Sequence, residues 1–144
     1  MTVSSRTSVA IHAMTKLAER GGQTRPSAEI AESLASNPVL VRRILGQLRD
    51  AGLVEATEGR HGGWTLARSP SMITLADAYR AMEPGPLLAG HPHEPSAACV
   101  VGRHIQRFLG DELDAAALAL ERRLGETTIA DVLDQVLEAE RLSS

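Results

Sequence analysis

The sequence contains few aromatic residues, a single cysteine and no long apolar run. Its three aromatic side chains, Trp64, Tyr79 and Phe108, are too few to form a stacking platform for single-stranded nucleic acid or sugars. The only cysteine, Cys99, excludes an internal disulfide framework and any metal or iron–sulfur site built from several cysteines of one chain. No apolar run approaches the roughly 18 residues of a membrane span, and no charged leader precedes an apolar stretch at the N-terminus. We therefore expect a cytoplasmic protein with no membrane partner.

What remains is the composition of a soluble globular chain. The 144 residues are 43% apolar and 23% charged, which suits one domain, with or without an appendage, whose core needs no disulfide or metal. The net charge of −3 hides an asymmetry, because residues 1–70 carry +3 and residues 71–144 carry −6. Binding of a polyanion depends on the local field, so the basic half is compatible with such a partner.

The N-terminal half begins with three expected helices. Apolar spacing predicts a first helix over residues 5–20 and a second that begins at Ser27, its expected N-cap. Asn37-Pro38 is a start signal for a third helix, since asparagine caps and proline suits the first helical position. This third helix is expected to stop at Gly52. The tight turn at residues 35–37 makes the second and third helices a helix-turn-helix.

A hairpin is expected directly after these helices. Residues 53–56 and 64–67 alternate like strands, and the glycine-rich loop 57–63 joins them. A hairpin that follows a recognition-type helix is a wing, whose loop lies near the DNA backbone or minor groove. We therefore predict a mainly α fold with a small β-hairpin wing and a winged helix-turn-helix domain over residues 1–83.

The C-terminal half is expected to hold a loop and two further helices. Capping boxes at Thr74 and Thr128 open helices, and the four prolines of residues 84–98 mark a boundary, a sensor-type loop. Residues 99–144 are expected to form a long dimerisation helix and a C-terminal helix. A lone amphipathic helix must bury its apolar stripe, and a second copy of the chain is the economical partner. The residues assigned to this stripe are Ile105, Phe108, Leu109, Leu113, Ala116 and Leu120.

Basic and polar side chains lie where DNA would need them. Arg42 and Arg43 lie near the N-terminal end of the third helix, away from its apolar stripe, and arginine can bridge O6 and N7 of guanine. Val39 or Leu40 could contact thymine methyl groups. Candidate contacts with the DNA backbone and the minor groove are Arg25, Ser27, Asn37, Arg49, Arg60 and His61. The alternative for each is an ordinary solvated surface residue, and Glu58 beside Arg60 is unfavourable to phosphate.

Several segments resemble the Rrf2 family of bacterial winged-helix transcription regulators, the family of IscR- and NsrR-type proteins. The most specific are LRDAGLV (48–54), GGWTLAR (62–68) and ITLADAYRAME (73–83). CVVGRHI (99–105) and TTIADVL (127–133) resemble the C-terminal half of the family. The resemblance spans nearly the whole chain. It implies a homodimer paired through the long helix and bound to a pseudo-palindromic double-stranded operator.

The sequence departs from the family at its sensor. Well-known members hold an iron–sulfur cluster with three cysteines, whereas this chain has only Cys99, which makes a cluster unfavourable and leaves no cofactor expected. Three interpretations of Cys99 stay open: a small apolar residue, a thiol switch, or a ligand helped by a partner chain. A helix N-terminus and nearby Arg103 favour reactivity of the thiol. The candidate helper residues are His12, His91 and His93, whose spacing matches no strong metal motif.

Two hypotheses of different classes follow. The first is a dimeric, sequence-specific DNA-binding regulator, a repressor, that responds to redox or nitrosative signals through Cys99. The alternative is a winged-helix protein–protein interaction module that has lost DNA binding, suggested by the acidic balance and Glu58. An enzyme is not expected, because the chain has no phosphate loop, HExxH motif or nucleophile elbow.

Overall fold

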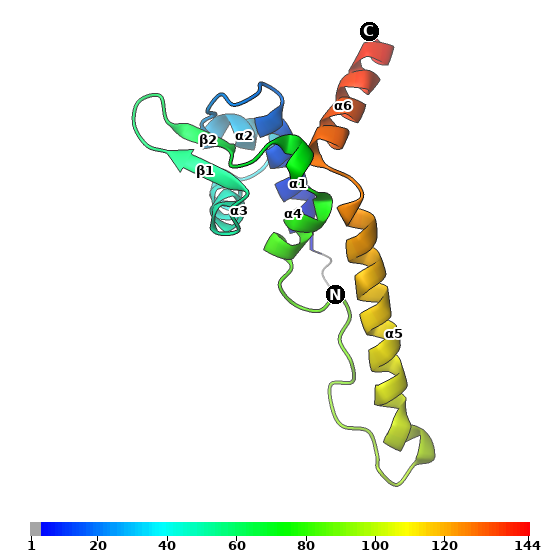
Figure 1. Cartoon of the computed structure of the whole chain (residues 1–144). Helices are drawn as coiled ribbons and strands as arrows, with labels where there is room; N and C mark the ends of the chain where they lie inside the picture. The colour runs from blue at the N-terminus through cyan, green and yellow to red at the C-terminus, as the bar shows by residue number, and fades with distance from the viewer. Residues whose placement is uncertain (1–3) are drawn as a thin grey trace.

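The computed structural model describes residues 4–144 as a helical body from which one long helix projects (Figure 1). The elements in chain order are α1 (Arg6–Ala18), α2 (Ser27–Leu34), α3 (Pro38–Asp50), β1 (Val54–Thr57), β2 (Gly63–Leu66), the 3-10 turn η1 (Pro70–Met72), α4 (Leu75–Met82), α5 (Val100–Gly125) and α6 (Ile129–Ser143). This confirms the predicted mainly α fold with a two-stranded antiparallel wing and a long C-terminal helix.

The core lies between α1, α2, α3 and α4. Helix α1 is rich in alanine, and its fully buried Ala10 and Ala13 let neighbouring helices approach closely. Met14 on the same helix and Ile44 and Leu45 on α3 fill the space between them. Each of these side chains is removed from water, which is the main favourable term in folding. The core therefore fixes α3 against the body by one face and leaves its other face to solvent.

The turn between α2 and α3 depends on local chemistry. Ala35 adopts a left-handed conformation with φ +47°, and its N–H donates to carbonyls of the last turn of α2. The Asn37 side chain accepts from the Val39 N–H at 2.8 Å, and Pro38 occupies the first turn of α3 as predicted. Ser27 differs from the prediction. Pro26 is the N-cap of α2 and Ser27 is its first helical residue, with no capping hydrogen bond, because Pro26 already supplies the extended backbone of a cap.

Helix α6 begins inside the N-terminal core. The capping boxes at Thr74 and Thr128 are both formed. The two capped segments lie antiparallel, with Leu75 N–H donating to Thr127 O and Ile129 N–H donating to Ile73 O, both at 2.9 Å. Ile129 is fully buried in the same cluster as the core of the winged-helix part. The expected C-terminal unit, residues 99–144, is thus joined to the body where α6 starts.

Helix α5 leaves the body and has much less cover. It packs beside α4 near its C-terminal end and then runs away from the body, with the loop 84–98 descending alongside it (Figure 1). None of the residues of α5 is buried. Cys99 and the start of α5 therefore lie at the end of the molecule far from the wing. No helix of the described chain is both long enough and apolar enough to cross a membrane.

Candidate nucleic-acid interface

Helix α3 presents one face to the core and the opposite face to solvent. Val41, Ile44, Leu45 and Leu48 are buried, while Arg42 and Arg43 are exposed. Val39 at the start of the helix is 56% exposed, whereas Leu40 is half-buried and packs against the core. The helix thus projects two guanidinium groups and one apolar side chain from its N-terminal half. Its N-terminal cap Asn37 is also exposed.

The wing places a second group of polar side chains beside this helix. Strands β1 and β2 pair with Val54 opposite Leu66 and Thr57 opposite Gly63. The loop between them carries Arg60 and His61, both exposed. Their neighbours Glu55 and Glu58 are also exposed, so the wing has carboxylates as well as cations on its surface. Within the loop the charges of Glu58 and Arg60 balance, so Arg60 is the one side chain there whose fixed charge suits a phosphate.

The base of the wing is attached to the loop between α1 and α2. Arg25 N–H donates to Trp64 O at 3.0 Å, and Trp64 N–H donates to Arg25 O at 2.8 Å. Thr24 Oγ1 donates to His61 O at 2.9 Å. A Cβ at Gly63 would lie 2.4 Å from the Arg25 carbonyl oxygen, and Gly63 has φ +155°. The close approach of these two backbones therefore requires glycine at residue 63.

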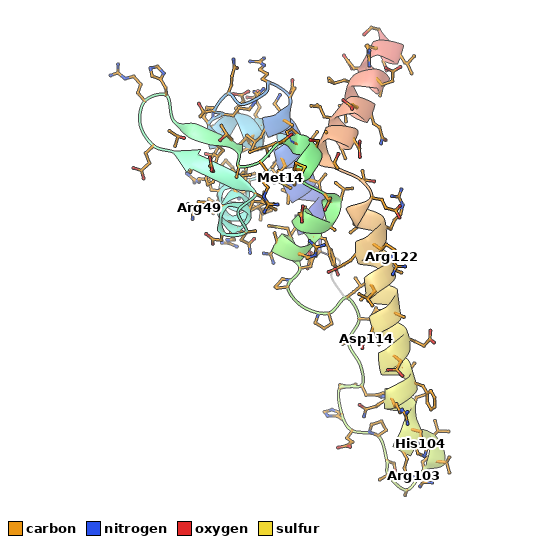
Figure 2. The ribbon with its side chains drawn as sticks, viewed as in Figure 1. Met14, Arg49, Arg103, His104, Asp114 and Arg122 are labelled. Atoms are coloured by element: carbon orange, nitrogen blue, oxygen red, sulfur yellow. The ribbon has the colours of Figure 1, made fainter. Side chains whose placement is uncertain are left out.

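Of the predicted backbone contacts, the structure contradicts Arg25 and gives the exposed Arg49 a partner within the chain. Arg25 is only 3% exposed, and its guanidinium pairs with Glu29 on α2, while Nε and Nη2 have no partner among the described residues. The buried position contradicts a phosphate contact by Arg25. Arg49 is exposed, but its guanidinium lies over the Trp64 ring, 5.9 Å from the ring centroid, where α3 meets the wing (Figure 2). Sequence reasoning missed Trp64 as a link, although it is the only tryptophan and directly follows two glycines.

The candidate sensor residues are not brought together in one chain. Cys99 is exposed at the N-cap of α5, and His91 and His93 are exposed in the preceding loop. His12 lies on α1, where its Nε2 is 3.1 Å from Ser33 Oγ on α2. Among residues 4–144, no three His, Cys, Asp or Glu side chains are grouped to hold a metal ion. Within the described residues, Cys99 therefore has no second and third ligand grouped beside it.

The Cys99 thiol has a distinct environment. The backbone N–H groups of Gly102 and Val101, in the first turn of α5, lower the pKa of the Cys99 thiol. The Arg103 guanidinium turns back to donate to Ala97 O at 2.9 Å, so it tethers the loop to the first turn of α5. A Cβ at Gly102 would lie 2.2 Å from Ser96 O, so the glycine lets the loop pass close to the helix. The arrangement stabilises a thiolate at an accessible position.

The predicted dimer stripe of α5 divides between two faces. Ile105, Leu113 and Leu120 are half-buried within the chain, whereas Ala116 is exposed. Phe108 is 64% and Leu109 40% exposed. Leu109 and Leu113 line a cavity of about 410 Å³ together with Pro86 and Leu88 of the descending loop. Part of the stripe is thus covered by the chain itself, and the part around Phe108 is open.

The fold and the exposed surface of α3 and the wing define a winged helix-turn-helix DNA-binding protein. Residues 3–135 match the Rrf2 family, described as iron-dependent transcriptional regulators. The chain is 30% identical over 134 residues to YwnA of Bacillus subtilis (strain 168), whose name classes it with the HTH-type transcriptional regulators. The match covers 93% of this chain and 98% of YwnA. The chain belongs to the Rrf2 family.

Two further comparisons agree with this assignment. The HTH-type transcriptional regulator CymR of B. subtilis is 31% identical over 88 residues, which cover 60% of this chain and 63% of CymR. The structure of T. potens IscR superposes with a TM-score of 0.70 at 26% identity and covers 96% of this chain and 90% of IscR. The protein is therefore a DNA-binding transcriptional regulator and not an enzyme. This favours the first of the two hypotheses over an interaction module without DNA binding.

Proposed function

We propose that the protein represses transcription as a homodimer that binds a pseudo-palindromic operator with two copies of α3 and the wing. The single observation that supports this most strongly is the exposure of Arg42 and Arg43 beside the buried Val41 and Ile44. The core holds the helix, and the two arginines project from its N-terminal half, the half that enters the major groove in helix-turn-helix proteins. Repression is the mode in which an occupied operator blocks the promoter.

The proposed reading surface assigns separate roles to separate side chains. Arg42 and Arg43 bind guanine edges, and Val39, together with the edge of Leu40, contacts thymine methyl groups. Phosphates are contacted by Asn37 at the start of α3 and by Ser27 with the N–H groups of the first turn of α2. Arg60 and His61 contact the backbone or minor groove from the wing tip. Base contacts give sequence preference, and phosphate contacts give affinity and its salt dependence.

The proposed dimer uses the open face of α5. Phe108, Ala116 and Leu118 are exposed on α5 without cover from the other described residues, and several exposed apolar side chains on one helix support an interface there. A second copy that packs its own α5 against this face removes both apolar surfaces from water. Pairing also brings two recognition helices to one DNA molecule, and the half-sites should then be spaced by about one helical turn or a multiple.

The proposed signal is oxidation or nitrosation of Cys99, without a resident iron–sulfur cluster. With a peroxide as oxidant, the Cys99 thiolate attacks one oxygen, the O–O bond breaks and the other oxygen leaves as hydroxide. Sulfur loses two electrons to the peroxide and becomes a sulfenic acid. Cys99→Ser should abolish any oxidant effect on DNA affinity. Iron and zinc analysis of protein purified without oxygen tests the absence of a metal, since stoichiometric iron with visible absorption bands would overturn it.

The DNA-binding surface is tested by affinity for the upstream region of the protein's own gene and for unrelated DNA. Arg42→Ala with Arg43→Ala should lose most of the preference for the specific sequence, since each bidentate arginine gives about 1–3 kcal/mol of discrimination. Arg141→Ala is the matched control, because Arg141 is an exposed arginine in the last turn of α6, on neither α3 nor the open face of α5. Intact affinity and preference in the double variant would show that the assigned reading residues are wrong.

A further inference from the structure

The wing is held to the body at its base, and Thr24 Oγ1 also donates to the His61 carbonyl in the loop. Trp64, the second residue of β2, forms the paired backbone attachment at the base. Its backbone forms both hydrogen bonds to Arg25, and its half-buried ring packs against the core. Arg60 lies in the loop between the two strands, beside His61. The direction in which the wing points is therefore set largely around Trp64.

Arg49 reaches the same point from the recognition helix. It lies in the last turn of α3, and its guanidinium carbon is 5.9 Å from the centroid of the Trp64 ring. A Cβ at Gly46, one turn earlier, would be 3.9 Å from an Arg49 terminal nitrogen, so the side chain lies back along α3. Its ion pair with Asp50, at 3.6 Å and exposed on both sides, contributes little. A guanidinium above a tryptophan face is attracted by the ring quadrupole.

Through these contacts a single tryptophan joins α3, β2 and the loop before α2. Arg49 contacts the ring from α3, and Arg25 pairs with the backbone from the α1–α2 loop. The wing tip and α3 can contact the same DNA molecule together only when the wing has a suitable orientation relative to α3. Holding that angle in the free protein reduces the ordering that DNA binding must impose, which increases affinity.

We propose that Arg49 is a positioning residue for DNA binding, which acts through Trp64 on the angle of the wing and makes no phosphate contact of its own. This inference rests on the proposed function, because it requires the wing tip to contact DNA. It replaces the role expected for Arg49 from the sequence. It also assigns a role to Trp64, which links α3 and the wing, the two elements proposed to contact DNA.

Coupling between Arg49 and Arg60 tests the proposal with DNA. If Arg49 acts through the wing, Arg49→Ala weakens operator binding several-fold, but the loss it adds is smaller once Arg60→Ala has removed one of the two proposed wing contacts. If Arg49 binds phosphate directly, the fold-losses of affinity for the two variants multiply. Arg49→Ala then also lowers the slope of log K against log salt concentration by about 0.9 in the Arg60→Ala background. Arg42→Ala combined with Arg60→Ala is the control pair, for which the losses are expected to multiply.

Hydrogen exchange tests the same proposal without DNA. Arg49→Ala should speed exchange of the Trp64 and Arg25 amides severalfold while exchange of the α1 core amides stays unchanged. Arg49→Lys, which retains a cation above the ring, should lie close to the wild type, and Arg43→Ala should leave both amides unchanged. A change limited to the base of the wing separates this role from general destabilisation.

The outcomes distinguish this inference from the proposed function. Multiplying losses for Arg49 and Arg60, or unchanged exchange at Trp64 in Arg49→Ala, overturn the positioning role. The proposed reading surface fails on a different result, unchanged binding by the Arg42→Ala, Arg43→Ala double variant. If the Arg42→Ala, Arg43→Ala double variant loses its sequence preference as expected, but the losses of affinity for Arg49→Ala and Arg60→Ala multiply, only the role of Arg49 is overturned.

Discussion

The winged-helix body and helix α5 contain similar apolar residues, but these side chains differ in their exposure to solvent. In the body, Met14, Leu45 and Ile129 are fully removed from water by other parts of the same chain. On α5 no residue is buried, and Phe108 is 64% exposed although the helix has 26 residues. The body thus has a core that is closed to solvent, whereas the apolar face of α5 is open to solvent. The difference indicates that the described residues of one chain close the core of the body but leave an apolar face of α5 in water.

The largest effect is expected from a cavity in the closed core. Leu45→Ala removes a fully buried side chain of α3 and should lower the free energy of unfolding by about 2–5 kcal/mol, since the cavity adds to the lost burial. Val39→Ala on the same helix is the control and should change stability little, because Val39 is exposed. Urea unfolding followed by circular dichroism measures both. A loss below about 1 kcal/mol for Leu45→Ala would mean that the core is less closely packed than the structure shows.

The next effect concerns the open surface. Phe108→Asp should leave the helical content unchanged but abolish dimerisation, because a carboxylate cannot be buried without a partner at the centre of an interface. Analytical ultracentrifugation reports the mass, and operator affinity should fall because one chain reaches only one half-site. The control is Val136→Asp, an exposed apolar residue on α6. Val136 lies on another helix, so a carboxylate there leaves the Phe108 face of α5 unchanged. A Phe108→Asp dimer would exclude this face as the interface.

Features set by neighbouring residues were predictable from the sequence. The start of α3 follows from Asn37 and Pro38, whose capping and fixed φ act within one turn. The capping boxes at Thr74 and Thr128 are likewise complete within four residues. These elements appear where they were expected, within a residue or two, because each signal is local.

Features that depend on distant parts of the chain were not predictable. Arginine is almost always exposed, so Arg25 was expected on the surface, but its backbone pairs with Trp64, which is distant in the sequence, and this carries the side chain inward. The apolar period of α5 likewise could not separate residues covered by the loop, such as Leu113, from open ones such as Phe108. A pattern identifies an apolar face but does not say which chain covers it.

A smaller effect tests whether α6 belongs to the closed region. Thr128→Ala removes the capping hydrogen bond from the Asp131 N–H and should cost about 1 kcal/mol of global stability, because Ile129 next to it is part of the core. Ser27→Ala is the control, since Ser27 makes no capping hydrogen bond and should cost only a few tenths of a kcal/mol. Fraying of α6 alone, with an unchanged unfolding midpoint, would show that α6 is independent of the body.

The smallest effect concerns the N-terminal end of α5. There the Cys99 thiol should have a lower pKa than an ordinary thiol, although it contributes nothing to the stability of the fold. The N–H groups of Val101 and Gly102 stabilise the thiolate and lower the pKa of Cys99, so the thiolate persists to lower pH than in the unfolded chain. Alkylation by iodoacetamide follows the thiolate fraction. Its rate should therefore rise through a midpoint at lower pH in the native protein than in urea. Because Cys99 is the only cysteine, the label reports this site alone, and Cys99→Ser gives the background. Equal midpoints in the two states would mean that the helix N-terminus does not activate the thiol, and the proposed switch would then lose its chemical basis.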